Sequence, residues 1–195
     1  MQSYLPHHAR ASDAGAVLRF WFGEPPDYGT SLKRWFEKDA AFDAKVREGF
    51  LPLYERLAAA GDAEGWQQRA ADCLAYVIVL DQFPRNMFRG TARAFGTDPL
   101  ALAAAEHAVR NGYDRDMLAV EKQFIYLPFE HSESLADQER ACELTRPLGE
   151  ELHDWALRHK RIIERFGRFP HRNAVLGRAS TPEEIGFLRQ PGSSF

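Results

Sequence analysis

The sequence predicts an all-α protein, and three observations point to this fold class. Apolar residues recur every three or four positions along most of the chain, as they do on the buried face of a helix. Helix-capping motifs recur between these segments. No alternating apolar and polar run, flanked by turn residues, predicts a strand. We expect about eight or nine helices, whose short connections favour antiparallel pairs in a bundle or a short solenoid.

The first third of the chain predicts two helices separated by a loop. Ser12 or Asp13 can cap a first helix. The stretch GEPPDYG (residues 23–29) ends this helix, because its prolines and glycines do not continue one. A long apolar-periodic segment begins at about Ser31, and Pro52 is expected to bend or divide it.

The remaining segments are bounded by proline, glycine and capping residues. Asp62 is expected to begin a helix that runs to Pro84, where the proline stops it. The TDP motif (residues 97–99) predicts an alanine-rich helix that closes near Gly112. Later helices are expected from Asp116 or Met117 to Pro128, which breaks the helix, from Ser134 to about Thr145, from Pro147 or Leu148 through Phe166, and after the capping box of Thr181 and Glu184.

The composition is that of one globular domain. The chain has 195 residues, of which 45% are hydrophobic and 27% are charged, so it can bury a real core. We expect a single all-α domain over residues 1–195, with a core over about 12–189 and a mobile tail over 191–195. The N-terminus lacks the pattern of a signal peptide, and the two cysteines lack metal or redox spacing. These features predict a cytoplasmic protein without a cofactor.

The charge pattern argues against two classes of partner. The formal net charge is −3, so the whole molecule has no electrostatic attraction to nucleic acid or to an anionic membrane. The basic run from His159 to Arg172 is interpreted as a solvated helix face whose charges favour a helix C-terminus. The partner that we expect is instead a small anionic molecule or a peptide. The sequence does not indicate an oligomeric state.

Side chains suited to chemistry gather in three short segments, each at the end of an expected helix. The segments are DQFPRN (residues 81–86), LPFEHSE (127–133) and GRFPHRN (167–173). The Phe-Pro pairs are interpreted as helix stops, with the phenylalanine returning to the core. The candidate catalytic residues are His131 and Glu130, and the candidate ligand-binding residues are Asp81, Arg85, Asn86, Glu133, His171, Arg172 and Asn173.

Two interpretations of these segments stay open. If the segments converge, Arg85 and Arg172 would face the carboxylates of the three segments, with histidines nearby. Such a constellation can hold a small anion, or support acid–base chemistry by a histidine that a carboxylate orients. It can also be a buried network in which arginines and carboxylates only tie helix ends together. No metal is expected, because the chain lacks the helical zinc signature and a site would need His131 and His171 to meet.

Five motifs together resemble one bacterial family. They are RFWFG (residues 19–23), RWF (34–36), LDQFPRN (80–86), LPFEHSE (127–133) and GRFPHRN (167–173), and with them the chain resembles the bacterial domain-of-unknown-function family 924 from about Val17 to Phe187. The resemblance implies an all-α fold similar to tetratricopeptide arrays. It implies no activity, so whether the protein is an enzyme has to come from the residues themselves.

Two functions from different classes follow from these residues. The first is a helical protein with a polar pocket for a small anionic ligand, extended to acid–base enzyme activity by His131 with Arg85 and Arg172 as anion clamps. The second is a scaffold that binds a peptide in a helical groove. A groove spreads its special residues along a surface, whereas here they are concentrated in three short segments. This concentration favours the pocket.

Overall fold

The computed structural model describes residues 13–59 and 63–194, and this part of the chain is helical, without strands. Its α-helices are α1 (Asp13–Phe22), α2 (Ala40–Ala58), α3 (Ala63–Trp66), α4 (Ala70–Met87), α5 (Asp98–Arg110), α6 (Ala119–His131), α7 (Leu135–Thr145), α8 (Glu150–Phe166) and α9 (Pro182–Leu188). Short 3-10 helices lie at Lys33–Trp35, Ala92–Phe95, Arg146–Leu148 and Pro170–Arg172. The all-α prediction is confirmed. None of the helices in the described ranges combines the length and apolarity that a bilayer span requires.

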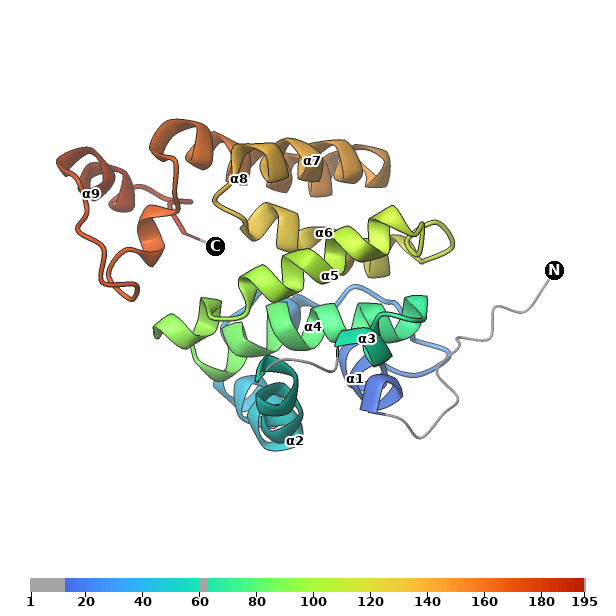
Figure 1. Ribbon diagram of the computed structural model, residues 1–195. Coiled ribbons are helices and arrows are strands. Elements are labelled where there is room, and N and C mark those ends of the chain that lie inside the picture. The colour runs from blue at the N-terminus through green and yellow to red at the C-terminus, as the bar shows by residue number, and fades with distance from the viewer. Residues whose placement is uncertain (1–12, 60–62, 195) are drawn as a thin grey trace.

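Helix α4 is the central element of the fold. It packs against α1, α2, α5 and α6, and Figure 1 shows it between α5 on one side and α1 and α2 on the other. Every residue from Cys73 to Met87 except Arg85 is buried. A helix that is buried all round has no solvated face on which to place polar side chains. The polar residues of its C-terminal half must therefore find their partners inside the protein.

The later helices form successive neighbours beyond α4. Helix α5 packs on α6, α6 on α7 and α7 on α8, and α8 also contacts α6. In Figure 1, α7 and α8 form an outer layer on the far side of α5 and α6 from α4. Packing between consecutive helices agrees with the expected helix pairs, whereas a tetratricopeptide-like repeat stays a prediction. The C-terminal end of α6 is covered by two helices, α7 and α8.

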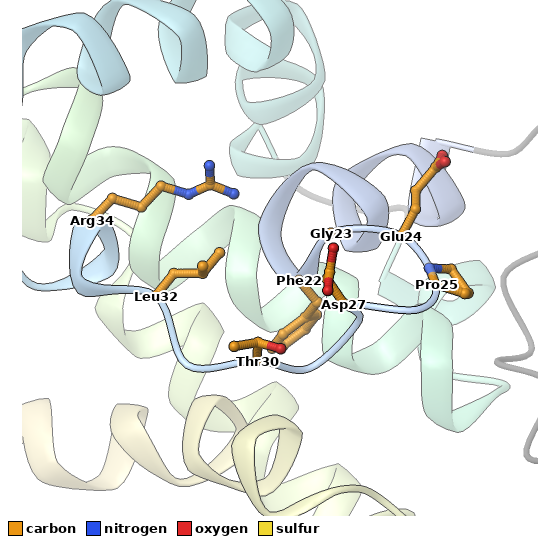
Figure 2. Close-up of a pocket in the computed structure, with 8 residues that line it drawn as sticks. All are labelled: Phe22, Gly23, Glu24, Pro25, Asp27, Thr30, Leu32 and Arg34. Carbon is orange, nitrogen blue, oxygen red and sulfur yellow. The ribbon is translucent and has the colours of Figure 1, made fainter.

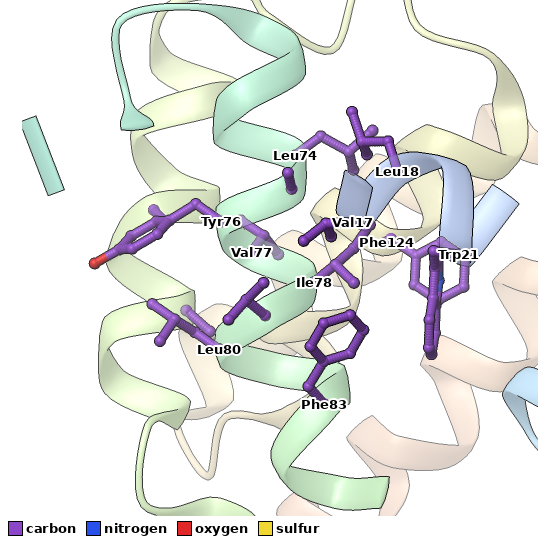
Figure 3. Packing of buried hydrophobic residues seen from close by; sticks show 14 of the residues in the cluster. Val17, Leu18, Trp21, Leu74, Tyr76, Val77, Ile78, Leu80, Phe83 and Phe124 are labelled. Atoms are coloured by element: carbon purple, nitrogen blue, oxygen red, sulfur yellow. The ribbon is translucent and has the colours of Figure 1, made fainter. Parts of the chain in front are cut away.

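An aromatic cluster joins α1, α4 and α6 in the core (Figure 3). Trp21 stacks on Trp35 with ring centroids 6.1 Å apart and meets Phe124 edge to face at 5.4 Å. Phe83 lies 5.7 Å from Trp21 and is fully buried. Phe169, the phenylalanine of the second Phe-Pro pair, is also fully buried. The expectation that both phenylalanines return to the core is confirmed.

The helix expected from about Ser31 begins later, at Ala40. Asp39 is its N-cap: one carboxylate oxygen accepts from the backbone N–H groups of Ala41 and Phe42 at 2.9 and 3.1 Å. A side-chain acceptor at this position satisfies donors that the first helical turn leaves without partners. The apolar periodicity before Asp39 belongs to a 3-10 turn and its flanking loop.

The helix expected from Asp62 to Pro84 is divided into α3 and α4. Around the break, the backbone carbonyls of Gln67 and Gln68 accept from the Tyr113 hydroxyl at 3.1 and 3.2 Å. These bonds come from the segment after α5, so a tertiary contact satisfies carbonyls that a continuous helix would have bonded. Asp62 itself, like the predicted cap Ser12, lies outside the described residues.

Helices α6 and α8 begin a few residues later than expected. The carboxylate of Glu121 reaches back to the backbone N–H of Leu118 at 2.8 Å, which fixes the first turn of α6 at Ala119. Gly149 precedes α8 with a backbone φ of +118°, a conformation that favours glycine, and the helix starts at Glu150. Local caps, rather than the start of the apolar pattern, set both boundaries.

Three prolines expected to interrupt helices lie inside them. Helix α2 continues through Pro52, α4 through Pro84 and α6 through Pro128. The predictions that Pro52 could divide its helix, and that Pro84 and Pro128 end theirs, were therefore wrong. A proline removes one helical hydrogen bond and crowds the preceding turn. Tertiary packing of the surrounding helix can outweigh that loss.

The structure shows how α4 accommodates Pro84. The lost backbone donor would have bonded the carbonyl of Leu80, and this carbonyl accepts instead from the Thr97 hydroxyl at 2.6 Å. The helix then resumes, because the N–H of Phe88 donates to the Pro84 carbonyl at 2.9 Å. DQFPRN is thus part of α4 rather than its end, and Asp81 and Arg85 lie one turn apart on one face.

Replacing Thr97 with valine should destabilise the protein, because the variant leaves the buried Leu80 carbonyl without a donor. We expect a loss of about 1–3 kcal/mol in the free energy of unfolding, measured by urea denaturation. In a Pro84→Ala background the backbone N–H is restored and Thr97→Val should cost much less. An equal loss in both backgrounds would show that the Thr97 hydroxyl does not compensate for the proline.

Candidate functional site

The candidate site includes two residues of α4, Asp81 and Arg85. Arg85 Nη1 donates to the Asp81 backbone carbonyl at 2.6 Å and lies 3.2 Å from Asp81 Oδ1. Asp81 is fully buried, whereas 18% of the Arg85 side chain is exposed. A carboxylate that is removed from water needs charged or hydrogen-bonding partners. The first such partner of Asp81 is Arg85, on the same helix.

The carboxylate of Asp98, in the first turn of α5, joins two arginines. It accepts from Arg85 through both oxygens at 2.8 and 3.0 Å, and from Arg172 Nη1 at 3.2 Å. Arg85 and Arg172 were expected to face Glu130, Glu133 and Asp81. Arg85 contacts Asp81, and the direct acidic partner of Arg172 is Asp98, with Glu133 and Asp81 close enough for their charges to act on it. Sequence reasoning missed Asp98 because an acidic residue in a first helical turn is explained by the helix dipole alone.

Arg172 is a buried cation with few partners. Only 6% of the residue is exposed, and its guanidinium carbon lies 4.6 Å from the Phe95 ring centroid and 4.5 Å from that of Phe169. Its Nε is buried and has no hydrogen-bond partner within the described part of the chain. Burial and the charge of Arg85 lower the pKa of Arg172 to about 10. Asp98, which also binds Arg85, therefore leaves part of the hydrogen-bonding capacity of Arg172 unused.

His131, at the end of α6, is the third member. Its Nδ1 lies 2.7 Å from Asp81 Oδ1, and the other oxygen of Asp81 accepts from Gln82 Nε2 at 2.5 Å. Although burial opposes it, the charge of Arg85 and the hydrogen bonds from His131 and Gln82 hold the pKa of Asp81 below its usual range. Asp81 is therefore an acceptor only, so the shared proton resides on Nδ1 of His131.

This tautomer leaves His131 Nε2 with a lone pair. Burial and the charge of Arg85 lower the pKa of His131, and Asp81 and Asp98 act in the opposite direction. A carboxylate that fixes the histidine tautomer is the arrangement that orients a general base. We call Asp81, Arg85, Asp98, His131 and Arg172 the polar cluster.

Glu130 belongs to a neutral contact beside the polar cluster. It is 3% exposed, and burial and the charge of Asp81 raise its pKa to about 8. Its Oε2 lies 3.5 Å from Nδ1 of His159, a distance at the limit of hydrogen bonding. Nδ1 of His159 lies closer to the Trp155 carbonyl, at 2.9 Å, and burial is the main cause that lowers the pKa of His159 to about 3. Both groups are uncharged at neutral pH, so this is not an ion pair.

Histidine and phenylalanine rings connect the two sides of the site. The His131 and His159 ring centroids are 6.2 Å apart, and His159 contacts Phe169 at 5.8 Å. Phe169 contacts His171 at 5.7 Å. Burial and the charge of Arg172 lower the pKa of His171 to about 4. His159 was expected on a solvated face of its helix, but it is buried with 5% exposure, because α8 packs it against the end of α6.

Asn86 extends away from the polar cluster. Its amide donates to Asp43 Oδ1 of α2 at 2.7 Å, and Arg89 donates to both oxygens of the same carboxylate at 2.5 and 3.0 Å. These bonds fasten the end of α4 to α2. A ligand-binding role for Asn86 stays a prediction.

Glu133 and Asn173 join a second network around Arg178, a residue that sequence reasoning missed. Glu133 accepts from Arg178 through both oxygens at 2.6 and 2.9 Å and from the backbone N–H of Phe169 at 2.8 Å. Asn173 accepts from Arg178 at 3.0 Å and donates to Ser180 at 3.1 Å. This network anchors the segment that carries Arg172. Ligand binding by Glu133 and Asn173 stays a prediction.

A separate cavity lies near the N-terminus (Figure 2). Its volume is about 490 Å³. It is lined by Phe22, Gly23, Glu24, Pro25, Asp27, Thr30, Leu32 and Arg34. None of these residues belongs to the three polar segments, so this cavity does not mark the candidate site. Within the described ranges, no group of three or more His, Cys, Asp or Glu side chains could hold a metal ion.

Comparisons with known proteins establish family and fold. A family model described as a bacterial protein of unknown function (DUF924) matches residues 17–192, which confirms the resemblance carried by the five motifs. The solved structure of the protein of unknown function ATU0120 from Agrobacterium tumefaciens is 44% identical to this chain, with a TM-score of 0.82. That match covers 90% of this chain and 96% of the other. The comparison with curated proteins finds no match.

Replacing Glu130 with glutamine should remove a pH dependence of stability. In the folded protein Glu130 keeps its proton up to about pH 8. In the unfolded protein it has the ordinary glutamate pKa of 4.5, so unfolding between these pH values releases the proton. The contribution of Glu130 to stability should therefore fall between these values, by at most about 1.4 kcal/mol per pH unit. Glutamine cannot ionise, so the variant should gain stability relative to wild type across this window.

Chemical denaturation at about pH 5 and about pH 8 measures this difference. The matched control is Glu143→Gln, because the Glu143 side chain is 63% exposed. Its stability relative to wild type should change little with pH. A constant difference between wild type and Glu130→Gln would mean that Glu130 is ionised in the folded protein.

Proposed function

We propose that this chain, which belongs to the DUF924 family of bacterial proteins of unknown function, binds a small anionic ligand at the polar cluster. The observation that carries the proposal is the state of Arg172. Its guanidinium is buried, shares one carboxylate with Arg85 and has an Nε without a partner among the described residues. An anion would supply charge-assisted hydrogen bonds to this cation and relieve its repulsion with Arg85.

The polar cluster is partly exposed. The side chains of Arg85 and Asp98 are each 18% exposed, and that of His131 is 13% exposed. Arg172 lies deeper, with 8% of its side chain exposed. A ligand would thus meet Arg85 and His131 at the rim and reach Arg172 below them. This gradient of exposure is what a binding site open at one end requires.

His131 gives the site a chemical role beyond binding. The hydrogen bond to Asp81 keeps a proton on Nδ1 of His131. Nε2 can therefore accept a proton from a bound ligand or from a water molecule. Protonated Glu130, beside it on α6, is the second acid–base group of the site. We propose His131 as general base, Asp81 as the residue that orients it, and Arg85 and Arg172 as the anion clamp.

A peptide-binding scaffold is the less favoured function. Among the described residues, the large apolar side chains that are exposed are Phe36, Leu100, Leu135, Trp155, Leu176 and Ile185. Each comes from a different helix or connection, so they form no stripe along one helix face. A helical groove for a peptide would present such a stripe.

The proposal is tested by thermal denaturation of the purified protein with phosphorylated and carboxylated metabolites. We expect stabilisation by at least one anion class, because a ligand at about 100 times its dissociation constant adds about 2.7 kcal/mol. Arg172→Gln should abolish the shift. This variant should still fold, since Asp98 keeps both hydrogen bonds to Arg85.

The matched control is Arg161→Gln, which removes an exposed arginine from α8 and should leave the anion response unchanged. If no anion stabilises the wild-type protein, the polar cluster is a structural network that joins α4, α5, α6 and the segment after α8. An equal loss of response in both arginine variants would point to a general charge effect instead.

A further inference from the structure

The charge balance of the polar cluster points to the kind of anion that it accepts. We infer that the ligand is a carboxylate with a single negative charge, and that it binds together with one proton taken up by His131. This inference rests on the proposed function and goes beyond it, because it names the ligand class and couples binding to pH.

The charges already present argue against a doubly charged ligand. The carboxylates of Asp81 and Asp98 are balanced by the guanidinium groups of Arg85 and Arg172, with which they share direct contacts. The neighbouring Glu130 and His159 are uncharged at neutral pH. A dianion would leave two uncompensated negative charges in a largely buried space, whereas a monoanion leaves one. A single added proton can compensate one charge.

His131 is the group placed to take that proton. Its Nδ1–H is held by Asp81, and Nε2 carries the free lone pair. The charged and titratable groups around it are Asp81 and Arg85 from α4, Asp98 from α5, Glu130 preceding it on α6, His159 from α8 and His171 from the segment after α8. An added anion near Arg85 would offset the cation that disfavours imidazolium and join the two carboxylates that favour it.

The geometry of Arg172 favours a planar carboxylate. Phe95 and Phe169 contact the guanidinium through their rings, so new hydrogen bonds have to form at its N–H edges. Nη1 is bonded to Asp98, and the edge that includes Nε has no partner among the described residues. Two N–H groups on one guanidinium edge match the two oxygens of a carboxylate. The partly exposed ring of Phe95 offers an apolar surface to the rest of such a ligand.

Propionate and malonate are the probes, since they share a three-carbon chain and differ by the second carboxylate, and sulfate is the inorganic dianion. Calorimetric titration near pH 7, in buffers of low and high ionisation enthalpy, measures the protons taken up. Propionate should bind more tightly than malonate or sulfate, with uptake approaching one proton. Its dissociation constant should rise up to about tenfold per pH unit above the pKa of unliganded His131. That pKa lies below the ordinary value of 6.5.

In His131→Gln the affinity for propionate should lose this pH dependence. The control His153→Gln, which removes a histidine of α8, should keep it. Propionate binding without proton uptake, or tighter binding of malonate or sulfate, overturns this inference but leaves the anion site standing. If none of the anions tested here or in the thermal screen binds, the proposed function itself fails. The wild-type titrations and the thermal screen together distinguish these outcomes.

Discussion

Because α4 is enclosed by α1, α2, α5 and α6, a polar side chain on its C-terminal half has to be paired inside the protein. Asp81 is the clearest case: it is fully buried and bonded to Gln82, Arg85 and His131. Arg85 in turn holds Asp98, and Asp98 holds Arg172. One buried carboxylate on the central helix thus leads to contacts that involve four separate segments of the chain.

One buried donor in this chain of contacts has no partner in the described structure. Arg172 keeps an Nε without a partner in the described structure, and its pKa is lowered by burial and by Arg85. A purely structural network is expected to satisfy its buried donors, because an unpaired one is costly. The unpaired Nε of Arg172 and the protonated Glu130 are the features that distinguish this cluster from an ordinary set of surface ion pairs.

The repeated Phe-Pro and Arg-Asn motifs converge on one region through different local structures. In α4 the proline lies within the helix, and the Thr97 hydroxyl donates to the carbonyl that the proline leaves without a backbone donor. The second proline, Pro170, lies outside a helix: α8 ends at its C-cap Gly167, whose φ is +66°, and Pro170 begins a 3-10 turn. The two arginines meet at Asp98, while the two asparagines bond elsewhere, to Asp43 and to Ser180.

The sequence by itself determined the helical class and drew attention to Asp81, Arg85, His131 and Arg172, because periodicity, caps and residue chemistry are local properties. It did not point to Asp98. It did not determine the partners. Arg172 and Asp98 are 74 positions apart, and Glu133 and Arg178 are 45 apart. Only helix packing brings such pairs together, and only packing decides that Pro84 stays within a helix and that His159 is buried. The charge state of Glu130 depends on that burial, and so could not be known before the tertiary structure.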